Sequence, residues 1–398
     1  MSWPLVALKD CCTVVGGATP KREVESYWDS QDIPWVTPKD ISKIKSIYLD
    51  DAPEYISQKG FDSCAAHKLP EGSLLLTSRA PIGNVAITTR ELCTNQGFKS
   101  LVPSESVDIK YLYFCMLYSA ERLENEGNGA TFKEVSKKVV EAFKIPLPPL
   151  ETQKKIAAVL EKADQLRKDC KLLEQELNSL AQSVFIDMFG DPVTNPKGWD
   201  VKPISSLLSQ PLQNGAYYPK EDYSDVGVEM VHMGDVFYDF IPRGGMKRVN
   251  ASKKDIEKYK LTSNDLLISR RSLMLAGAAK PSLIEESNED LIFESSMIRL
   301  TPNNEIINVM YLFYYLSNPI VKQHYIYQYI TGATIKGINQ SNLEKVEVLV
   351  PDYKLQESFL RIEQKIRNQK NELSNLATEY EANFNSLMQK AFKGELDL

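Results

Sequence analysis

Residues that could perform catalysis are scarce in this chain of 398 residues. The best candidate is Pro351-Asp352 followed by Glu363-Gln-Lys365, an order of acids and a lysine that metal-dependent nucleases also use. Glu363 and Lys365, however, flank the apolar stripe of a long predicted helix, and the first half of the chain has no equivalent acids. We therefore interpret these charges as part of a solvated helix surface.

Other catalytic patterns are missing from the sequence. It contains no GxxxxGK[ST] loop for a nucleoside triphosphate, and no glycine-rich loop followed by the acid that a dinucleotide or methyl donor requires. The Asn-Pro pairs at 195–196 and 318–319 continue with Lys and Ile, unlike the Asn-Pro-Pro-aromatic core of adenine methyltransferases. His67, His232 and His324 lack partners at the spacing of metal ligands or of a nucleophile and its base. We expect a non-catalytic chain without a metal or cofactor of its own.

Composition is typical of a globular protein of two domains, with 43% hydrophobic and 25% charged residues. The net charge of -6 argues weakly against nucleic-acid binding by the chain as a whole, but it does not describe a local groove. No apolar run is long enough to cross a bilayer, and the N-terminus lacks a signal-peptide pattern. All six cysteines precede residue 171 without a CxxC pair, which predicts reduced thiols and a cytoplasmic location.

The sequence contains an internal repeat, because five segments recur in the same order in both halves. The pairs are Trp3–Leu8 with Trp199–Ile204, Gly72–Arg79 with Asn264–Arg271, Tyr111–Phe114 with Tyr311–Tyr314, Gly129–Lys133 with Gly332–Lys336, and Ile145–Pro148 with Val348–Pro351. The sequence offset drifts between pairs, as variable loops between fixed anchors would produce. Two similar domains are therefore expected.

A long amphipathic helix is predicted after each copy, with apolar residues at alternating steps of three and four. The predicted seam positions, at which one helix would pack on the other, are Ile156, Val159, Ala163, Leu166, Cys170, Leu173, Leu177, Leu180 and Val184 in the first helix, and Phe359, Ile362, Ile366, Gln369, Leu373, Leu376, Tyr380, Asn383 and Leu387 in the second. Because the stripes match, mutual pairing is favoured over packing on separate domains. Gln369 and Asn383 either fix the register or face solvent.

The fold class is α+β. We expect short strands near 74–76, 85–88, 98–102 and 143–147, with counterparts near 266–269, 297–301 and 346–350, and helices over 111–124 and 310–317. The aromatic segment 311–329 fits a core helix and its packing partner better than a base-stacking platform. The predicted architecture is two mixed, strand-rich domains joined by two long antiparallel coiled-coil helices, related by a pseudo-two-fold repeat.

Several segments carry a family resemblance. Pro148–Gln153, Met188–Trp199 and Ala391–Leu396 resemble the specificity subunits of type I restriction-modification enzymes, and Ser78–Ala86 and Thr94–Lys99 resemble that family's first target-recognition domain. In the second domain, Ser272–Gly277 and Glu294–Met297 depart from the pattern, as different target sequences in the two halves would require.

The resemblance implies a sequence-specific DNA-binding subunit that reads a bipartite site. Target-recognition domains would occupy residues 1–148 and 191–351, and spacer helices 149–190 and 352–398. The helices would dock two methyltransferase subunits and, through them, restriction subunits. S-adenosylmethionine, ATP and magnesium would be bound by those partners. The remaining alternatives are a related system with fused methylation and cleavage subunits, a protein-binding coiled-coil scaffold, and an unrecognised enzyme.

DNA contacts require a concentrated basic face, since residues 1–150 and 199–355 each hold 17 basic and 19 acidic side chains. The candidates are Lys21, Arg22, Arg79, Lys99 and Lys133 in the first copy, and Lys220, Arg243, Arg270, Arg271 and Lys336 in the second. A 29-residue seam spans roughly 44 Å at about 1.5 Å per residue. That length corresponds to roughly 13 base pairs between the two contacts.

Overall fold

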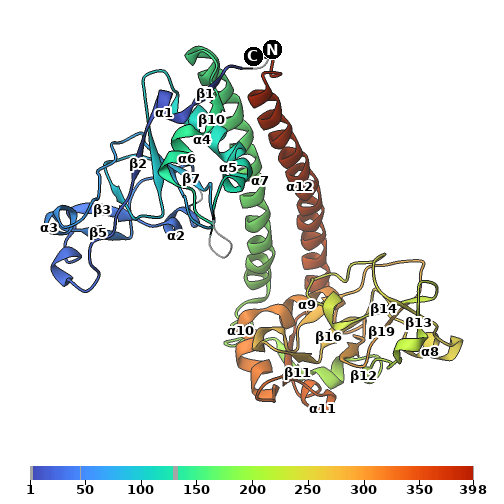
Figure 1. Ribbon diagram of the computed structural model, residues 1–398. Helices are drawn as coiled ribbons and strands as arrows, with labels where there is room; N and C mark the ends of the chain where they lie inside the picture. Colours follow the sequence, from blue (N-terminus) through green and yellow to red (C-terminus); the bar gives the residue numbers. More distant parts are fainter. Residues whose placement is uncertain (1–2, 45, 129–132, 398) are drawn as a thin grey trace. The chain divides into compact units, whose positions relative to one another are not determined.

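The computed structural model describes residues 3–44, 46–128 and 133–397. The chain divides into two compact units (Figure 1), of which unit 1 comprises Met1–Leu172 with Ser374–Leu398 and unit 2 comprises Leu173–Leu373. Unit 1 thus contains segments from both ends of the sequence. No helix in the described ranges is long and apolar enough to cross a membrane.

Unit 1 contains a five-stranded sheet of order β2-β9-β6-β7-β4, a three-stranded sheet of order β5-β3-β8 and the pair β1-β10. The strands are β1 (Leu5–Ala7), β2 (Cys12–Gly16), β3 (Ile33–Val36), β4 (Tyr48–Leu49), β5 (Glu54–Ile56), β6 (Leu74–Leu76), β7 (Val85–Thr88), β8 (Cys93–Thr94), β9 (Lys99–Pro103) and β10 (Lys144–Pro146). The helices that accompany them are α1 (Leu8–Cys11), α2 (Pro38–Ile41), α3 (Gln58–Asp62), α4 (Ile109–Tyr118), α5 (Ala120–Asn125) and α6 (Lys137–Ala142).

Unit 2 contains two four-stranded sheets, of order β12-β20-β16-β18 and β13-β15-β14-β19, and the pairs β11-β22 and β17-β21. The strands are β11 (Asp200–Pro203), β12 (Gln213–Asn214), β13 (Tyr223–Ser224), β14 (Val228–Val231), β15 (Arg248–Val249), β16 (Leu266–Ser269), β17 (Arg271–Ser272), β18 (Pro281–Leu283), β19 (Leu291–Phe293), β20 (Met297–Leu300), β21 (Lys336–Gly337) and β22 (Glu347–Val350). Its short helices are α8 (Lys253–Tyr259), α9 (Val309–Ser317), α10 (Pro319–Val321) and α11 (Gln340–Leu343).

The two units share one topology. The order β2-β9-β6-β7 in unit 1 is equivalent to β12-β20-β16-β18 in unit 2. In the second sheet of each unit, a central strand pairs antiparallel with one neighbour and parallel with the other, as β3 does with β5 and β8 and as β14 does with β15 and β19. The strands and helices predicted from the sequence are confirmed within one to two residues, apart from a break between α4 and α5.

Two long helices, α7 (Leu150–Phe189) and α12 (Tyr353–Lys393), each contribute to both units. In unit 1, Ile156 and Leu160 of α7 belong to one apolar cluster with Phe384 and Met388 of α12. In unit 2, the ring of Phe185 packs on Phe359 with centroids 5.5 Å apart. Early α7 residues thus meet late α12 residues, and late ones meet early ones, so the helices run antiparallel within each unit.

The predicted seam is correct at every second position. Buried or half-buried seam residues are Ile156, Ala163, Cys170, Leu177, Val184, Phe359, Ile366, Leu373, Tyr380 and Leu387. The prediction is wrong for the exposed residues Val159, Leu166, Leu173, Leu180, Ile362, Gln369, Leu376 and Asn383. In both helices the buried face instead includes the next residue along the chain, namely Leu160, Arg167, Glu174, Ala181, Glu363, Lys370, Ala377 and Phe384.

Polar side chains occupy half of the displaced positions, and Arg167 is the best-defined example. Arg167 lies 4.4 Å over the ring of Phe384 while its guanidinium pairs with Asp164 and Glu381. Its aliphatic stem covers apolar surface while its charge stays paired. A search for apolar residues alone therefore does not select Arg167 as a seam residue. Gln369 and Asn383 are exposed, which favours solvent exposure over register control as their explanation.

Aromatic side chains of the second copy lie in the core, as predicted. Tyr311 and Tyr315 of α9 are each 1% exposed, and the Tyr311 hydroxyl donates to the carbonyl of Leu349 at 2.8 Å. In unit 1, the hydroxyl of Tyr111 donates in the same way to Pro146 at 2.7 Å. The repeated tyrosines therefore tie equivalent helices to equivalent strands.

Candidate functional site

Glu134 neutralises two of the predicted DNA-binding cations of unit 1. Arg79 follows β6, and its Nε lies 3.1 Å from Glu134 Oε2, while Lys99 Nζ at the start of β9 lies 3.8 Å from Glu134 Oε1. Burial lowers the pKa of Lys99, and the nearby Glu134 opposes that shift. The structure brings these two cations close to one carboxylate, which sequence reasoning missed.

Arg22 is held by its own domain. Its two terminal nitrogens donate to Glu54 at 3.0 and 2.9 Å, and its guanidinium lies 3.8 Å above the ring of Trp28. The hydrogen bonds from Arg22 lower the pKa of Glu54. Arg22 therefore offers less free charge to a phosphate than its neighbour Lys21, which forms no ion pair in the described ranges.

Arg243 in unit 2 compensates a buried acid. Glu229 of β14 is 1% exposed, and it accepts hydrogen bonds from Arg243 Nε at 3.1 Å and from the amide of Gly244 at 3.0 Å. Arg248 lies 3.6 Å from the same carboxylate. A buried carboxylate needs such partners. The position of Arg243 thus indicates a structural role.

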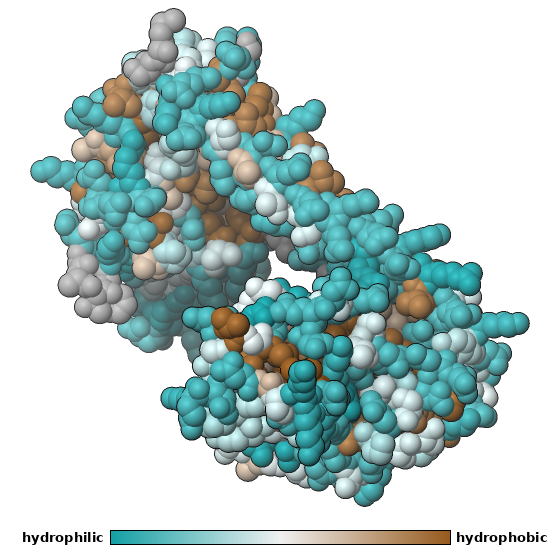
Figure 2. All heavy atoms as spheres, turned by 90° about the vertical axis from the view of Figure 1, so that its right-hand side faces the viewer, coloured by the Kyte–Doolittle hydropathy of each residue, from teal (hydrophilic) through white to brown (hydrophobic). Residues whose placement is uncertain are grey.

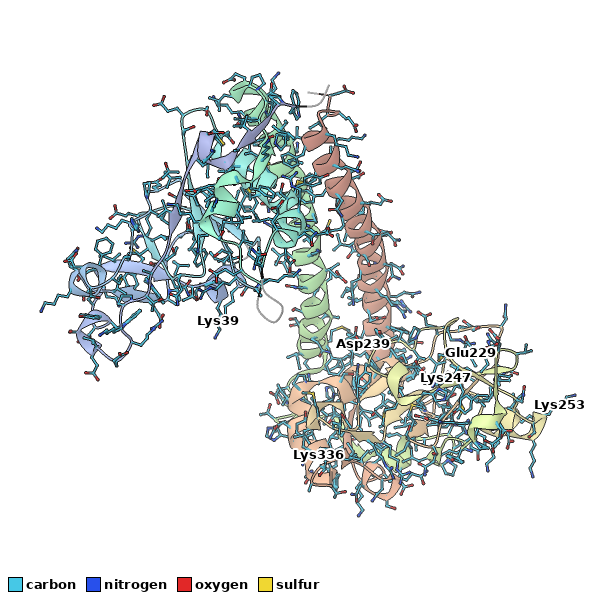
Figure 3. The ribbon with its side chains drawn as sticks, viewed as in Figure 1. Lys39, Glu229, Asp239, Lys247, Lys253 and Lys336 are labelled. Atoms are coloured by element: carbon cyan, nitrogen blue, oxygen red, sulfur yellow. The ribbon has the colours of Figure 1, made fainter. Side chains whose placement is uncertain are left out.

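Arg270, Arg271 and Lys336 form a different group. Strands β17 and β21 pair so that Arg271 is opposite Gly337 and Ser272 is opposite Lys336. None of the three cations takes part in an ion pair within the described part of the chain; Lys336 Nζ donates only to the carbonyl of Gly332, at 3.0 Å. Lys336 and Glu229 lie at different ends of this unit in Figure 3.

Gly332, four residues before Lys336, permits a tight turn. Gly332 has a φ of +104°, and a Cβ there would lie 2.0 Å from the carbonyl oxygen of Ile335. A shallow cavity of about 320 Å³ is lined by Arg270, Arg271 and this turn. In the first copy, the matching residues 129–132 lie outside the described residues, and Lys133 follows them as an exposed side chain.

Lys220 lies in a second hollow of unit 2, of about 810 Å³. Its lining includes Tyr217, Tyr223 and Lys247, and Tyr217 is 82% exposed. Sequence reasoning selected Lys220 but missed Tyr217 and Lys247. The run Tyr217-Tyr-Pro-Lys220, with aromatic residues next to a cation, was the available signal.

The nuclease-like pattern is not assembled into a site. Glu363 does not flank the seam as expected but lies on the buried face of α12, 3% exposed, whereas Lys365 is exposed. Burial raises the pKa of Glu363, and Arg367 opposes this effect. Across the described ranges, no three His, Cys, Asp or Glu side chains are grouped to hold a metal ion. His232 is engaged by the hydroxyl of Tyr223, 2.8 Å from its Nε2.

Comparisons with known proteins agree with the repeated topology. The family model for the type I restriction modification DNA specificity domain matches residues 2–181 and 196–383. The MjaIX specificity subunit of Methanocaldococcus jannaschii is 28% identical over 380 residues, which cover 90% of this chain and 85% of that protein. The EcoKI specificity subunit of Escherichia coli K12 is 23% identical over 292 residues, or 67% of this chain and 61% of that protein.

Solved structures show the same fold. A chain from a study of complex assembly and conformational transition of the type I R-M system superposes with a TM-score of 0.62 at 18% identity, covering 99% of this chain and 98% of that one. The S subunit of a type I system from M. genitalium gives a TM-score of 0.56 at 12% identity, covering 100% and 97%.

Proposed function

The chain belongs to the type I restriction modification DNA specificity family, and from this premise we infer that it is the non-catalytic subunit that recognises DNA for such an enzyme. The observation that carries this inference is the double match of the family model, once to each copy of the repeated topology. The scaffold and enzyme alternatives are not favoured, because the relatives are specificity subunits over most of their length.

Each domain reads one half of a split DNA site under this proposal. Two domains with one topology but different surface loops are suited to two different short sequences, since base edges are read by loop side chains while phosphate contacts fix orientation. The paired helices α7 and α12 supply the unread spacing between the halves. Target recognition is thus assigned to residues 1–148 and 191–351, and spacing to 149–190 and 352–398.

The contacting residues divide by their charge environment. In the second domain, Arg270, Arg271 and Lys336 support DNA contact because they are free of carboxylate partners among the described residues. In the first domain, Arg79 and Lys99 are available to phosphates when DNA competes with Glu134 for them. Lys21, Lys133 and Lys220 remain further candidates for phosphate contact, whereas Arg22 and Arg243 are better explained as internal partners of Glu54 and Glu229.

Two methyltransferase subunits dock on the helical part of the chain, and restriction subunits join through them. S-adenosylmethionine binds to the methyltransferase subunits, and ATP and magnesium bind to the restriction subunits. The complex acts on cytoplasmic DNA. The buried, free state of Cys11, Cys12, Cys93 and Cys115 is compatible with a reducing compartment.

Mapping methylated adenines in the source genome tests this function. With the gene intact, methylation is expected at one bipartite motif with a fixed gap, and deletion of the gene abolishes it. Binding of the assembled complex to that motif should weaken steeply with salt, because phosphate contacts release counterions. Loss of the gene without any change in methylation, together with salt-independent binding, would contradict the proposal.

A further inference from the structure

An exposed apolar tip follows Arg270 and Arg271, which have no ion-pair partner among the described residues. Leu273 and Met274, directly after β17, are 78% and 72% exposed. Ile335, next to Lys336 on the neighbouring turn, is 53% exposed. Because Ser272 is opposite Lys336 in the β17-β21 pair, the tip and Ile335 lie on adjacent chain segments. Figure 2 shows that this face is largely hydrophilic, with scattered hydrophobic patches.

The tip is held in place by hydrogen bonds. Ser272 Oγ accepts from the amide of Met274 at 3.1 Å, and the amide of Gly277 donates to the Met274 carbonyl at 3.1 Å. At the base of the loop, the amide of Ala279 donates to the carbonyl of Ser269 at 2.9 Å. A Cβ on Gly277 would lie 2.4 Å from Ser272 Oγ, so a larger residue there would require the Ser272 side chain to shift. The loop therefore presents two large apolar side chains to solvent in a defined conformation.

The equivalent loop of the first domain is tucked inward. There, Ile82 is 6% exposed and belongs to the main apolar cluster of unit 1. Gly83 packs on Ala120, where an added Cβ would lie 2.7 Å from the Ala120 Cβ. The apolar side chain in the first loop, Ile82, thus packs in the core of its domain. In the second domain, Leu273 and Met274 are exposed and do not contribute to the core in this way.

We propose that Leu273 and Met274 form a wedge that enters the base stack of the second half-site, while Arg271 and Lys336 hold the flanking phosphates. Leucine and methionine are among the side chains that unstack and kink a duplex when inserted between base pairs. Cations that lack a carboxylate partner within the described ranges, next to an apolar tip, are suited to DNA, whose backbone is anionic and whose stacked bases are apolar. This inference rests on the proposed function and adds to it deformation of the DNA at one base step.

The test uses the chain assembled with its methyltransferase subunits and duplexes that carry the motif found by methylation mapping. 2-Aminopurine is placed at successive positions of the second half-site, where unstacking raises its fluorescence. The wild-type complex is expected to raise the signal at one step, and Leu273→Ala/Met274→Ala to abolish the rise. The double variant should also bind roughly tenfold more weakly, because two apolar side chains are no longer buried. Val201→Ala, another exposed apolar position in unit 2, is the matched control.

The outcomes separate the possible failures. Unchanged fluorescence and affinity in the double variant would place the tip away from the DNA and overturn the wedge. Loss of subunit assembly with normal DNA contacts would make the tip a protein-docking surface, which also overturns it. Absence of any methylated bipartite motif would instead refute the proposed function itself.

Discussion

Gln153 and Gln356 make the same three hydrogen bonds at the starts of α7 and α12. The Gln153 carbonyl oxygen accepts from the amide of Asp108 at 2.9 Å, and its amide nitrogen donates to Ser106 and Pro148 at 3.0 and 2.8 Å. Gln356 repeats the pattern with Asn308 at 2.7 Å and with Ile306 and Pro351 at 3.2 and 2.8 Å. Both side chains are at most 1% exposed. Each glutamine therefore fixes its helix to its domain.

Replacing either glutamine by leucine is expected to destabilise its unit. Gln153→Leu and Gln356→Leu each leave one buried amide N–H and two carbonyls without partners, at a cost of about 1–3 kcal/mol per unsatisfied group. Thermal unfolding measured by circular dichroism should show a lower Tm for each variant. Gln369→Leu, at an exposed position of α12, is the control. Equal Tm values for all three variants would contradict the structural role.

Arg243→Ala and Arg271→Ala should have opposite effects. Arg243→Ala leaves the buried Glu229 with Arg248 as its remaining cation, so we expect a loss of about 2 kcal/mol or more in unfolding free energy. Arg271→Ala should leave the Tm unchanged, weaken DNA binding about equally across sequences and reduce the salt slope by about one, because a phosphate contact is lost. Calorimetry and binding isotherms on both variants check this. A stable Arg243→Ala protein with impaired binding would restore Arg243 as a reader.

Arg79→Ala should weaken recognition of one half-site while subunit assembly stays intact. Its guanidinium is about half exposed and sits beside Glu134, so its removal leaves no buried charge behind. Mass photometry would measure subunit assembly, and methylation mapping would show which half-site has lost sequence specificity. If assembly is lost instead, Arg79 is a structural residue.

Glu134→Gln is expected to strengthen DNA binding through phosphate contacts, with little gain in sequence specificity. The change frees Arg79 and Lys99 from their shared carboxylate. The slope of log affinity against log salt concentration should steepen by the amount that roughly one to two additional phosphate contacts produce. Glu91→Gln, which removes the exposed partner of Lys68, serves as the control. An unchanged slope would indicate that neither cation reaches the DNA.

Glu363 makes stability depend on pH. Burial raises its pKa above that of the unfolded chain, so its contribution is fully present below the unfolded pKa and is lost as pH rises through the folded pKa. Glu363→Gln removes the cost of ionising a buried carboxyl. The variant should therefore have a higher Tm than wild type at pH 7 and an equal Tm near pH 4. A lower Tm at pH 7 would show that the Glu363–Arg367 pair outweighs the burial.

Repetition made most of the fold predictable, whereas charge pairing did not follow from the sequence. Two copies of one pattern identified both domains and both long helices. The seam was displaced at every second position, and at Arg167, which packs on Phe384 with its charge paired, an apolar-only pattern could not detect the buried residue. In the same way, Glu134 lies far in sequence from Arg79, and an isolated antiparallel bridge outside the sheets brings them together. Residue types alone therefore supplied candidate cations but did not show which of them are paired with carboxylates.

The hydrogen bond from Trp3 Nε1 to the carbonyl of Ala391, at 2.8 Å, joins the first strand region to the end of α12. Phe392 also packs on Tyr111, with ring centroids 5.6 Å apart. The core of unit 1 therefore remains incomplete during synthesis until the last helix has left the ribosome, although most of its residues emerge first. Unit 2 is one continuous stretch of chain and can close earlier, so the nascent protein is expected to finish its second half before its first.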